Sequence, residues 1–592
     1  MESRLVVNLG VQRFDKLREE HKFYVDKTDF IREWWEYGSE VTLITRPRRF
    51  GKTLNMSMLA CFFSNRYAGR GDLFEGLSIW EEKVSKQEDS IQDIFRQDVS
   101  GQDTSIEVYK YRHLQGMFPV VFLSFAPIKT GKIDEMKMVV KIVIADLYGT
   151  FKDIIKSEVF DDNDRSAFAE VNKDMEDAVA YTAVNRLCGF LKRYYHKDVI
   201  VILDEYDTPM QEAWLAGTWD ETVDFFRNFF NHTFKTNGCL FRGIITGITR
   251  VSKESIFSDL NNLDVITTTS GAYADAFGFT QEEVFAALER AGLGSEKEGV
   301  KQWYNGFSFG RYTDIYNPWS IASFISKRGE YRAYWANTSG NELVSTLVQR
   351  GNADVKQTME SLLQGNCFQT ELDEQIVFHN LKGSANAVWS LLLATGYLKV
   401  EKLEYIGIRK KAMYTLALTN MEVINMFENM VKGWFREAAE VSYNRFIKAL
   451  LLNDVEAMNE FINKVALHSF SSFDIANGVS DDDAPERFYH GFVLGLIVEL
   501  EGRFRITSNR ESGFGRYDIM ITPFDRKQDC AYIIEFKVHK PRREKNLEET
   551  VANALSQIEK KQYETVLTAE GFEPEQIRKY GFAFYGKECL IG

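Results

Sequence analysis

The residues best suited to chemistry form one segment near the N-terminus, Arg46-Pro47-Arg48-Arg49-Phe50-Gly51-Lys52-Thr53-Leu54. It follows a short apolar run rich in β-formers, Val41 to Thr45, and precedes residues typical of a helix. A strand, a tight loop ending in Gly-Lys-Thr and a helix are the layout of a phosphate-binding loop. Gly51 would let the backbone approach phosphate oxygens, Lys52 would contact the β- and γ-phosphates, and Thr53 would ligate Mg²⁺. Residues 46–54 are therefore predicted to bind a nucleoside triphosphate.

One position departs from the general pattern. Phosphate-binding loops of this kind carry glycine five residues before Gly51, where this chain has Arg46. The loop from Arg46 to Arg49 is predicted to be stiff and strongly basic. The alternative is a chance Gly-Lys-Thr before a core helix, but the flanking strand and helix favour the nucleotide site.

A second polar group follows the apolar run Val199 to Leu203, which is typical of a strand buried on both faces of a parallel sheet. The run ends in Asp204 and Glu205. Ligands bind at the carboxyl ends of such strands, so Asp204 is predicted to hold the Mg²⁺ shell and Glu205 to polarise the attacking water. A strand with a solvated acidic end is the alternative.

A third predicted strand, Leu240 to Gly247, ends near Thr246 and Arg250. Thr246 is a candidate sensor of the γ-phosphate, and Arg250 is a candidate cationic finger that would reach it. A helix-capping threonine and a surface arginine remain the alternative.

The C-terminal part of the chain carries a separate acidic and basic cluster. Glu535 and Lys537 stand two residues apart on a predicted strand, so both point to one face. Asp518, placed on the preceding predicted strand, can share a divalent metal with Glu535, and Glu486 is a candidate further ligand. The metal would activate a water, and Lys537 would orient that water and stabilise negative charge. An ordinary Glu–Lys surface pair is the alternative.

The elements predicted around this cluster run in the order helix, three strands, helix, strand, over residues 486–500, 503–509, 516–521, 531–537, 547–563 and 580–585. This order matches a restriction-endonuclease-like core. The basic run Lys540, Arg542, Arg543 and Lys545 could hold a phosphate backbone.

The middle of the chain is less informative. A helix with a Thr280 cap is predicted over residues 277–293, and the aromatic segments 303–307 and 316–319 are predicted to anchor a small lid core rather than to form a cage for a base. Residues 340–470 are predicted to be helical, with a winged-helix-like helix and β-hairpin over 388–418. Contact of this hairpin region with DNA and internal packing both remain open.

Whole-chain properties limit the functional classes. The chain has 592 residues and a net charge of −14, so nucleic acid would have to be bound by local patches such as 46–49 and 537–545. No run of 18 apolar residues and no signal-peptide core are present, and no membrane contact is expected. The six cysteines are scattered without Cys-x-x-Cys spacing, which indicates reduced thiols and a cytoplasmic location.

Several segments spread over about 300 residues together resemble one family: YVDKTDFI, LITRPRRFGKTLNMSML, VILDEYDTPM, GITRVSKESIFSDLNNL, FGFTQEEV, WYNGFSFG and IYNPWSI. They are similar to the AAA-ATPase-like family whose members carry a C-terminal PD-(D/E)XK nuclease domain. The resemblance implies a P-loop NTPase related to STAND and archaeal ATPases, in which arginine is usual at the position of Arg46. It also implies supporting polar roles for Gln557 and Tyr563.

The sequence and this resemblance predict an α/β protein with four parts: a P-loop NTPase domain over 1–275, a helical lid over 276–340, a helical and winged-helix-like region over 341–475, and a restriction-endonuclease-like domain over 476–592. The predicted function is an ATP-binding and hydrolysing protein that controls a fused Mg²⁺-dependent nuclease, with Mn²⁺ as a further candidate metal. Nucleic acid, with DNA favoured, is the predicted partner, and a homo-oligomer is left open. The alternative is a regulatory or scaffold protein whose nuclease-like domain binds nucleic acid without cutting it.

Overall fold

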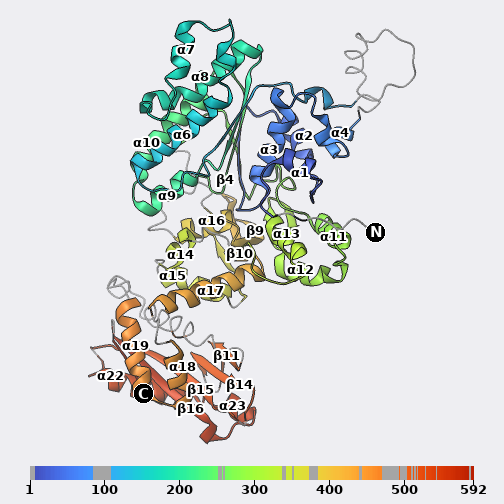
Figure 1. Cartoon of the computed structure of the whole chain (residues 1–592). Coiled ribbons are helices and arrows are strands. Elements are labelled where there is room, and N and C mark those ends of the chain that lie inside the picture. The colour runs from blue at the N-terminus through green and yellow to red at the C-terminus, as the bar shows by residue number, and fades with distance from the viewer. Residues whose placement is uncertain are drawn as a thin grey trace. The chain divides into compact units, whose positions relative to one another are not determined.

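The computed structural model describes residues 7, 9–83, 109–250, 256–257, 260–335, 342–349, 353–363, 365–372, 385–438, 443–469, 493, 500, 503–508, 511–512, 515–516, 518–526, 528–541, 543–585 and 588–592 (Figure 1). The chain divides into two compact units, and each is described by itself. The first comprises residues 1–344 and 369–423, and the second comprises 345–368 and 424–592.

The first unit is built on a five-stranded parallel sheet with the order β2-β3-β4-β1-β5. Its strands are β1 (Val41–Thr45), β2 (Val120–Ser124), β3 (Val199–Asp204), β4 (Leu240–Gly247) and β5 (Leu263–Ile266). All residues of β1 and β3 are buried, as their sequences, rich in valine, isoleucine and leucine, predict for strands covered on both faces. Because the strands are parallel, their carboxyl ends meet at one edge, where the predicted polar residues follow.

Helices cover both faces of this sheet. Figure 1 shows α6, α8 and α10 on one face and α1, α2 and α3 on the other. The helices are α1 (Phe14–Glu19), α2 (Asp29–Tyr37), α3 (Lys52–Phe63), α4 (Ser78–Glu81), α6 (Ile133–Thr150), α7 (Asp162–Ala169), α8 (Asp177–Tyr195), α9 (Thr208–Ala216) and α10 (Trp219–Phe230). The first unit is thus an α/β layer structure, as predicted.

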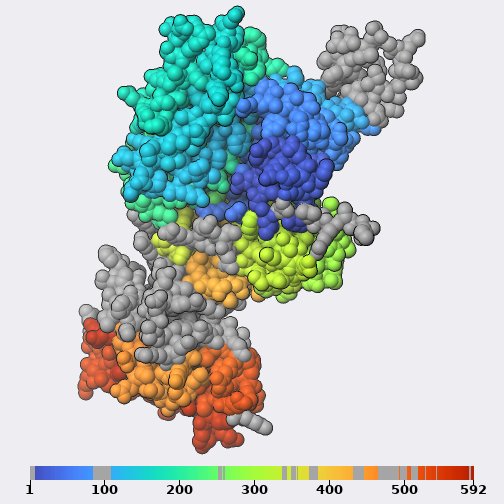
Figure 2. Space-filling model, viewed as in Figure 1, coloured from blue at the N-terminus to red at the C-terminus, as the bar shows by residue number. Residues whose placement is uncertain are grey.

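A small lid follows the sheet in the chain. It comprises α11 (Gln281–Arg290), α12 (Lys297–Tyr304), the hairpin of β6 (Phe307–Phe309) and β7 (Tyr312–Ile315), and α13 (Pro318–Ser326). The Thr280 cap is confirmed, because its hydroxyl and the Glu283 side chain form a capping box. Tyr304 and Tyr316 lie in the lid's apolar core, which agrees with the anchoring role predicted for the aromatic segments. Figure 2 shows the blue N-terminal residues against the yellow-green lid, where the Lys27 ammonium donates to the Glu283 carboxylate at 2.7 Å.

The predicted winged-helix-like elements are present. They are α16 (Ala385–Ala394) and the antiparallel hairpin of β9 (Leu398–Ile406) and β10 (Lys411–Leu418), which β8 (Phe368–Thr370) joins on the β10 side. Residues 387–393 of α16 are buried, so this helix is an internal element of its unit. In the chain, α14 (Glu342–Gln349) and α15 (Ala353–Leu363) precede this region, and α17 (Met421–Ala438) follows it.

The second unit contains a mixed five-stranded sheet with the order β11-β14-β15-β16-β17. The strands are β11 (Phe504–Ser508), β14 (Ile519–Pro523), β15 (Ala531–Val538), β16 (Ile577–Tyr585) and β17 (Glu588–Ile591). The helices α18 (Tyr443–Leu452) and α19 (Val455–Ser469) contribute to the core on one face, and α22 (Leu547–Lys561) and α23 (Thr565–Ala569) contribute to a core that contains Ile533.

Two details of this unit differ from the predicted elements. The predicted strand 516–521 is divided, because β13 (Gly515–Arg516) forms a short hairpin with β12 (Glu511–Ser512), and β14 begins only at Ile519. The strand β17 was not predicted, and it extends the sheet beyond β16. The predicted helix 486–500 lies almost wholly outside the described residues. None of the described helices is both long enough and apolar enough to span a lipid bilayer.

Candidate functional site

The predicted phosphate-binding loop joins β1 directly to α3. Arg49 and Gly51 both adopt left-handed backbone conformations, with φ of 64° and 81°. The tight turn places Lys52 at the start of α3, where its ammonium donates to the carbonyl oxygens of Arg46 at 3.0 Å and Pro47 at 2.8 Å. Burial lowers the pKa of Lys52, while the negative charge of Glu205 opposes this shift. The loop therefore curls around a buried ammonium, as a phosphate-binding loop does.

The carboxylate of Asp204 ties this loop to the sheet. The Thr53 hydroxyl donates to Asp204 Oδ2 at 2.7 Å, and the Thr246 hydroxyl donates to Oδ1 at 2.5 Å. The strand order explains this arrangement, because β4, which carries Thr246, lies between β1 and β3. Residues from three segments far apart in sequence thus converge on one buried carboxylate.

Glu205 follows Asp204 in a conformation that is uncommon for a glutamate. Its φ is 53°, in the left-handed region, and such strain is often found at functional positions. Burial raises the pKa of Glu205, and the nearby negative charge of Asp204 raises it further. A carboxyl group with a raised pKa beside a buried lysine is suited to accept a proton near neutral pH.

The sequence did not single out Asp207, which organises the same edge of the sheet. Its Oδ2 accepts hydrogen bonds from the amides of Ile248 and Thr249, at 3.0 and 2.8 Å, and from the Thr249 hydroxyl at 2.7 Å. Oδ2 also accepts from Gln211 Nε2 at 3.0 Å, and Gln211 Oε1 in turn accepts from Arg48 Nη2 at 3.0 Å. A chain of hydrogen bonds therefore runs from the loop to the turn that precedes Arg250.

One of the three loop arginines, Arg46, does not face the predicted nucleotide site. Arg46 is fully buried, and its guanidinium donates to main-chain carbonyls of Thr45, Thr267, Ala272 and Tyr273. The prediction that the Arg46 side chain makes the loop basic toward a phosphate is therefore corrected. The guanidinium is buried and donates its hydrogen bonds to main-chain carbonyls. The Arg49 guanidinium lies over the Trp319 ring at 4.4 Å, and Phe50 packs against Phe307 and Phe309.

The lid holds the loop from outside the sheet. Asn317 Nδ2 donates to the carbonyl of Arg48 at 3.2 Å, while its Oδ1 accepts from the amides of Trp319 and Ser320 and so caps α13. A side chain on Gly396 would meet Pro47 Cγ at 2.9 Å, so the residues before β9 also lie against the loop. The segment Asn-Pro-Trp was noted in the sequence for its aromatic content, and nothing local in it points to the loop.

Two other predicted residues have less defined surroundings. Leu54 lies in the first turn of α3 and is partly buried. Arg250 lies three residues after β4 and is also partly buried, and residues 251–255 after it lie outside the described residues. The role of Arg250 as a finger stays a prediction.

In the second unit, Glu535 and Lys537 lie on β15 as predicted. Glu535 is 1% exposed, and its Oε1 accepts a hydrogen bond from Gln557 Nε2 on α22. The Lys537 ammonium lies 3.6 Å from the same oxygen. Gln557 Nε2 also donates to the Tyr563 hydroxyl at 3.3 Å, so of the two supporting residues implied by the family resemblance, Gln557 contacts the Glu535 carboxylate and Tyr563 contacts Gln557.

Asp518 immediately precedes β14 and joins the same group. Its Oδ2 accepts a hydrogen bond from the amide of Phe536 at 2.7 Å, next to Glu535 in the chain. The pKa of Tyr563 is raised chiefly by burial, and Glu535 and Asp518 raise it further while Lys537 lowers it. The hydrogen bond from the Phe536 amide thus ties Asp518 to the residue next to Glu535 on β15.

Comparison with known proteins gives a family match for each of the two regions that carry these residues. Residues 8–257 match the family model described as a predicted AAA-ATPase, and residues 484–592 match the PD-(D/E)XK nuclease superfamily. This is an AAA-ATPase-like protein with a C-terminal PD-(D/E)XK nuclease superfamily domain. A curated relative from Azotobacter chroococcum mcd 1, called an uncharacterized protein in the vnfD 5' region, is 26% identical over 98% of this chain and 97% of its own length.

Both domains offer oxygen atoms that could act as ligands to a divalent metal ion. In the AAA-ATPase-like domain, Thr53 and Asp204 offer two adjacent oxygen donors, which fits Mg²⁺ because this ion usually keeps several waters and phosphate oxygens as ligands. In the PD-(D/E)XK domain, Asp518 and Glu535 supply two carboxylates. Within the described part of the chain, no group of three or more histidine, cysteine or acidic residues could hold a metal. Glu486, the predicted further ligand, lies outside the described residues.

Proposed function

We propose that this protein binds and hydrolyses ATP and uses the nucleotide state to control a metal-dependent nuclease in the same chain. The observation that carries the proposal is the convergence of acidic, basic and hydroxyl side chains around two separate buried carboxylates. One is Asp204 at the edge of the parallel sheet, and the other is Glu535 in the PD-(D/E)XK domain.

In the AAA-ATPase-like domain, the first turn of α3 and Lys52 would bind the triphosphate, because helix amides and a lysine ammonium favour anionic oxygen. Thr53 and Asp204 would hold Mg²⁺, which neutralises the charge that develops on the phosphates. Glu205 would orient the attacking water and accept its proton, which its raised pKa assists. Thr246 donates a hydrogen bond to the same Asp204 carboxylate and would sense whether a γ-phosphate is bound.

In the PD-(D/E)XK domain, Asp518 and Glu535 would hold the divalent ion, Mg²⁺ or Mn²⁺. When bound there, such an ion would supply a water of lowered pKa and positive charge next to the phosphate. Lys537 would position the water and stabilise negative charge near Glu535. Gln557 fixes the Glu535 carboxylate through its amide, which keeps the ligand oriented. Nucleic acid, with DNA as the first substrate to examine, is the proposed partner.

Paired variants test the two halves separately. Lys52→Ala should weaken ATP binding by about 30-fold or more, because loss of one partner of a desolvated charge pair costs about 2–5 kcal/mol. Lys132→Ala removes a well-exposed ammonium and serves as the matched control. Titration calorimetry with ATP measures both variants. ATP affinity that survives Lys52→Ala would contradict the assignment of the loop.

Glu535→Gln should abolish cleavage of labelled DNA and RNA with Mg²⁺ or Mn²⁺ and leave ATP hydrolysis unchanged. Glu559→Gln, an exposed carboxylate on the same domain's α22, is the matched control. Cleavage by wild type that depends on ATP and is lost in Lys52→Ala would support control of the nuclease by the nucleotide. If wild type binds ATP and nucleic acid but cuts nothing with either metal, the scaffold alternative replaces the proposal.

A further inference from the structure

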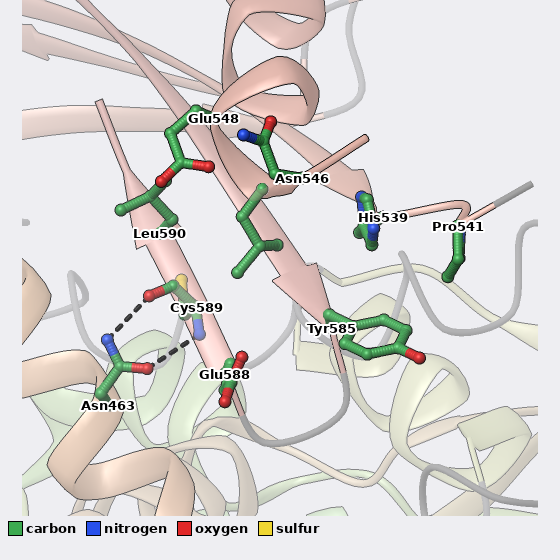
Figure 3. Close-up of a pocket in the computed structure, with 10 residues that line it drawn as sticks. Asn463, His539, Pro541, Asn546, Glu548, Tyr585, Glu588, Cys589 and Leu590 are labelled. Carbon is green, nitrogen blue, oxygen red and sulfur yellow. Dashed lines mark hydrogen bonds between the residues drawn. The ribbon is translucent and has the colours of Figure 1, made fainter. Parts of the chain in front are cut away.

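The PD-(D/E)XK domain contains a pocket outside the Glu535–Lys537 cluster. Its volume is about 670 Å³, and it opens where β15 and β16 end and α22 begins. Figure 3 shows Asn546 and Glu548 on one side of the pocket and Tyr585 and Glu588 on the other, with His539 near Tyr585. None of the described residues discussed above as nuclease candidates lines this pocket.

The pocket nevertheless lies beside the proposed nuclease site along the chain. His539 lies two residues after Lys537, and its amide donates to the carbonyl of Phe584 at 2.8 Å, so it continues the pairing of β15 with β16. At about 3.3 Å per strand residue, the two backbone positions are roughly 7 Å apart. This distance matches the spacing of one nucleotide along an extended strand, which places the pocket next to the attacked phosphate.

An aromatic wall forms one part of the pocket. Tyr585 is 50% exposed, and its ring meets the His539 ring edge-on, with centroids 5.3 Å apart and planes at 88°. His539 is itself fixed, because its Nδ1 lies 2.9 Å from the Thr550 hydroxyl. A half-exposed tyrosine that packs against a partly buried histidine ring is suited to stack against a planar group.

The two carboxylates of the pocket disfavour a phosphate as its occupant. Among the described residues that line it, Glu548 and Glu588 carry a charge at neutral pH, and none is a lysine or arginine. The cations Lys540, Arg543 and Lys545 belong instead to the segment between β15 and α22, outside the lining. An acidic, aromatic pocket favours a neutral planar group with hydrogen-bond donors, while the adjacent cations favour the phosphate backbone.

We propose that this pocket receives an unpaired nucleobase with an exocyclic amine, one nucleotide away from the phosphate held at Glu535 and Lys537. The proposal rests on the proposed function, because it requires nucleic acid at this domain. Tyr585 stacks on the base, and Glu548 or Glu588 accepts a hydrogen bond from its amine. The pocket thus makes the site prefer single-stranded or unpaired positions.

The test uses the full chain with Glu535→Gln, so that bound strands are not cut. Single-stranded DNA and RNA oligonucleotides carry one 2-aminopurine, a fluorescent base with an exocyclic amine, moved one position at a time. We expect fluorescence quenching at one position, and an abasic residue at that position should weaken binding about 5- to 100-fold, as expected for a lost base–aromatic stack. Replacing that base with thymine or uracil should weaken binding in wild-type pockets but not in Glu548→Gln/Glu588→Gln.

Two variants identify the stacking ring. Tyr585→Ala should remove the quenching, whereas Tyr585→Phe should keep it because the ring is retained. Phe524→Ala, which removes a ring that is 67% exposed in the same domain and outside the pocket, should also keep it. Oligonucleotide binding with equal quenching at every position, or quenching that survives Tyr585→Ala, overturns the pocket proposal alone. Failure of every oligonucleotide to bind overturns the proposed nucleic-acid function and the pocket with it.

Discussion

Arg46 provides the sharpest test of how the phosphate loop is built. Its guanidinium donates to four main-chain carbonyls, at 3.0 Å to Thr45, 2.7 Å to Thr267, 3.1 Å to Ala272 and 3.3 Å to Tyr273. It also lies over the Phe309 ring at 4.5 Å. These contacts join the end of β1 to the segment after β5, so we expect the side chain to stabilise the fold rather than to bind phosphate.

The magnitude follows from these contacts. Arg46→Gly leaves buried carbonyls without donors, and hydrogen bonds to charged groups contribute about 1.5–3 kcal/mol each. Burial lowers the pKa of Arg46 to about 9, so desolvation of the cation offsets part of that gain. A net loss of about 3–5 kcal/mol is expected, as for other disrupted buried charge networks. For a unit of about 400 residues, with an unfolding entropy of about 2.1 cal/mol/K per residue, this lowers the melting temperature by roughly 4–6 °C.

Thermal unfolding and ATP calorimetry measure the two effects independently. Arg46→Gly should melt at a lower temperature, and at a temperature where it is folded it should retain most of its ATP affinity. Arg46→Lys, which keeps the charge but not the planar fork of donors, should give a smaller loss of stability. If Arg46→Gly melts like wild type and loses ATP as Lys52→Ala does, the guanidinium is a phosphate ligand and this reasoning fails.

Three further predictions concern residues that act on the proposed reactions. Asn317→Ala should raise the KM for ATP more than it lowers kcat, and Asn317→Asp, which keeps the α13 cap but cannot donate to Arg48, should behave likewise; a wild-type KM in the Asp variant would contradict this. Glu205 must be ionised to accept a proton, and its pKa is raised, so the rate of ATP hydrolysis should fall on acidification at a pH above about 4.3, the ordinary pKa of glutamate. A pH–rate profile in which the rate falls only at or below that pH would refute the role. Gln557→Leu should cut nuclease activity or metal affinity about 10- to 100-fold with ATP hydrolysis intact, and unchanged metal dependence would exclude its orienting role.

The elements with strong local patterns could be predicted from sequence. The buried strands at Val41 and Val199 are rich in β-branched and apolar residues, the eight-residue strand at Leu240 is long enough to be recognised despite Arg242, and the Thr280 capping box has a local signature. β5 escaped prediction because its four residues, Leu263 to Ile266, are interrupted by an aspartate. The predicted domain boundaries at 275, 340 and 475 stay predictions.

The candidate sites were predictable only in part. Lys52, Thr53, Asp204, Glu535 and Lys537 occupy strand ends or alternate strand positions, which sequence spacing reveals. The roles of Arg46, Asp207 and Asn317 depend on partners up to 269 residues away, so no local pattern could show them. Asp518 was placed on a strand because the short hairpin before β14 has no distinctive sequence pattern.

Residues beyond the matched ATPase region contact the loop and α3, which limits where the chain can be shortened. The matched ATPase family region ends at residue 257, yet Phe50 packs against Phe307 and Phe309, and the Asn55 amide donates to the carbonyl of Ala276 at 2.8 Å. A chain that ended at residue 257 would leave the Phe50 ring and the Asn55 side-chain amide without these partners. The region that matches the family model is thus shorter than the region that packs together around the loop. A chimaera made with a relative would have to exchange the longer region, including residues 276–309, to keep these contacts.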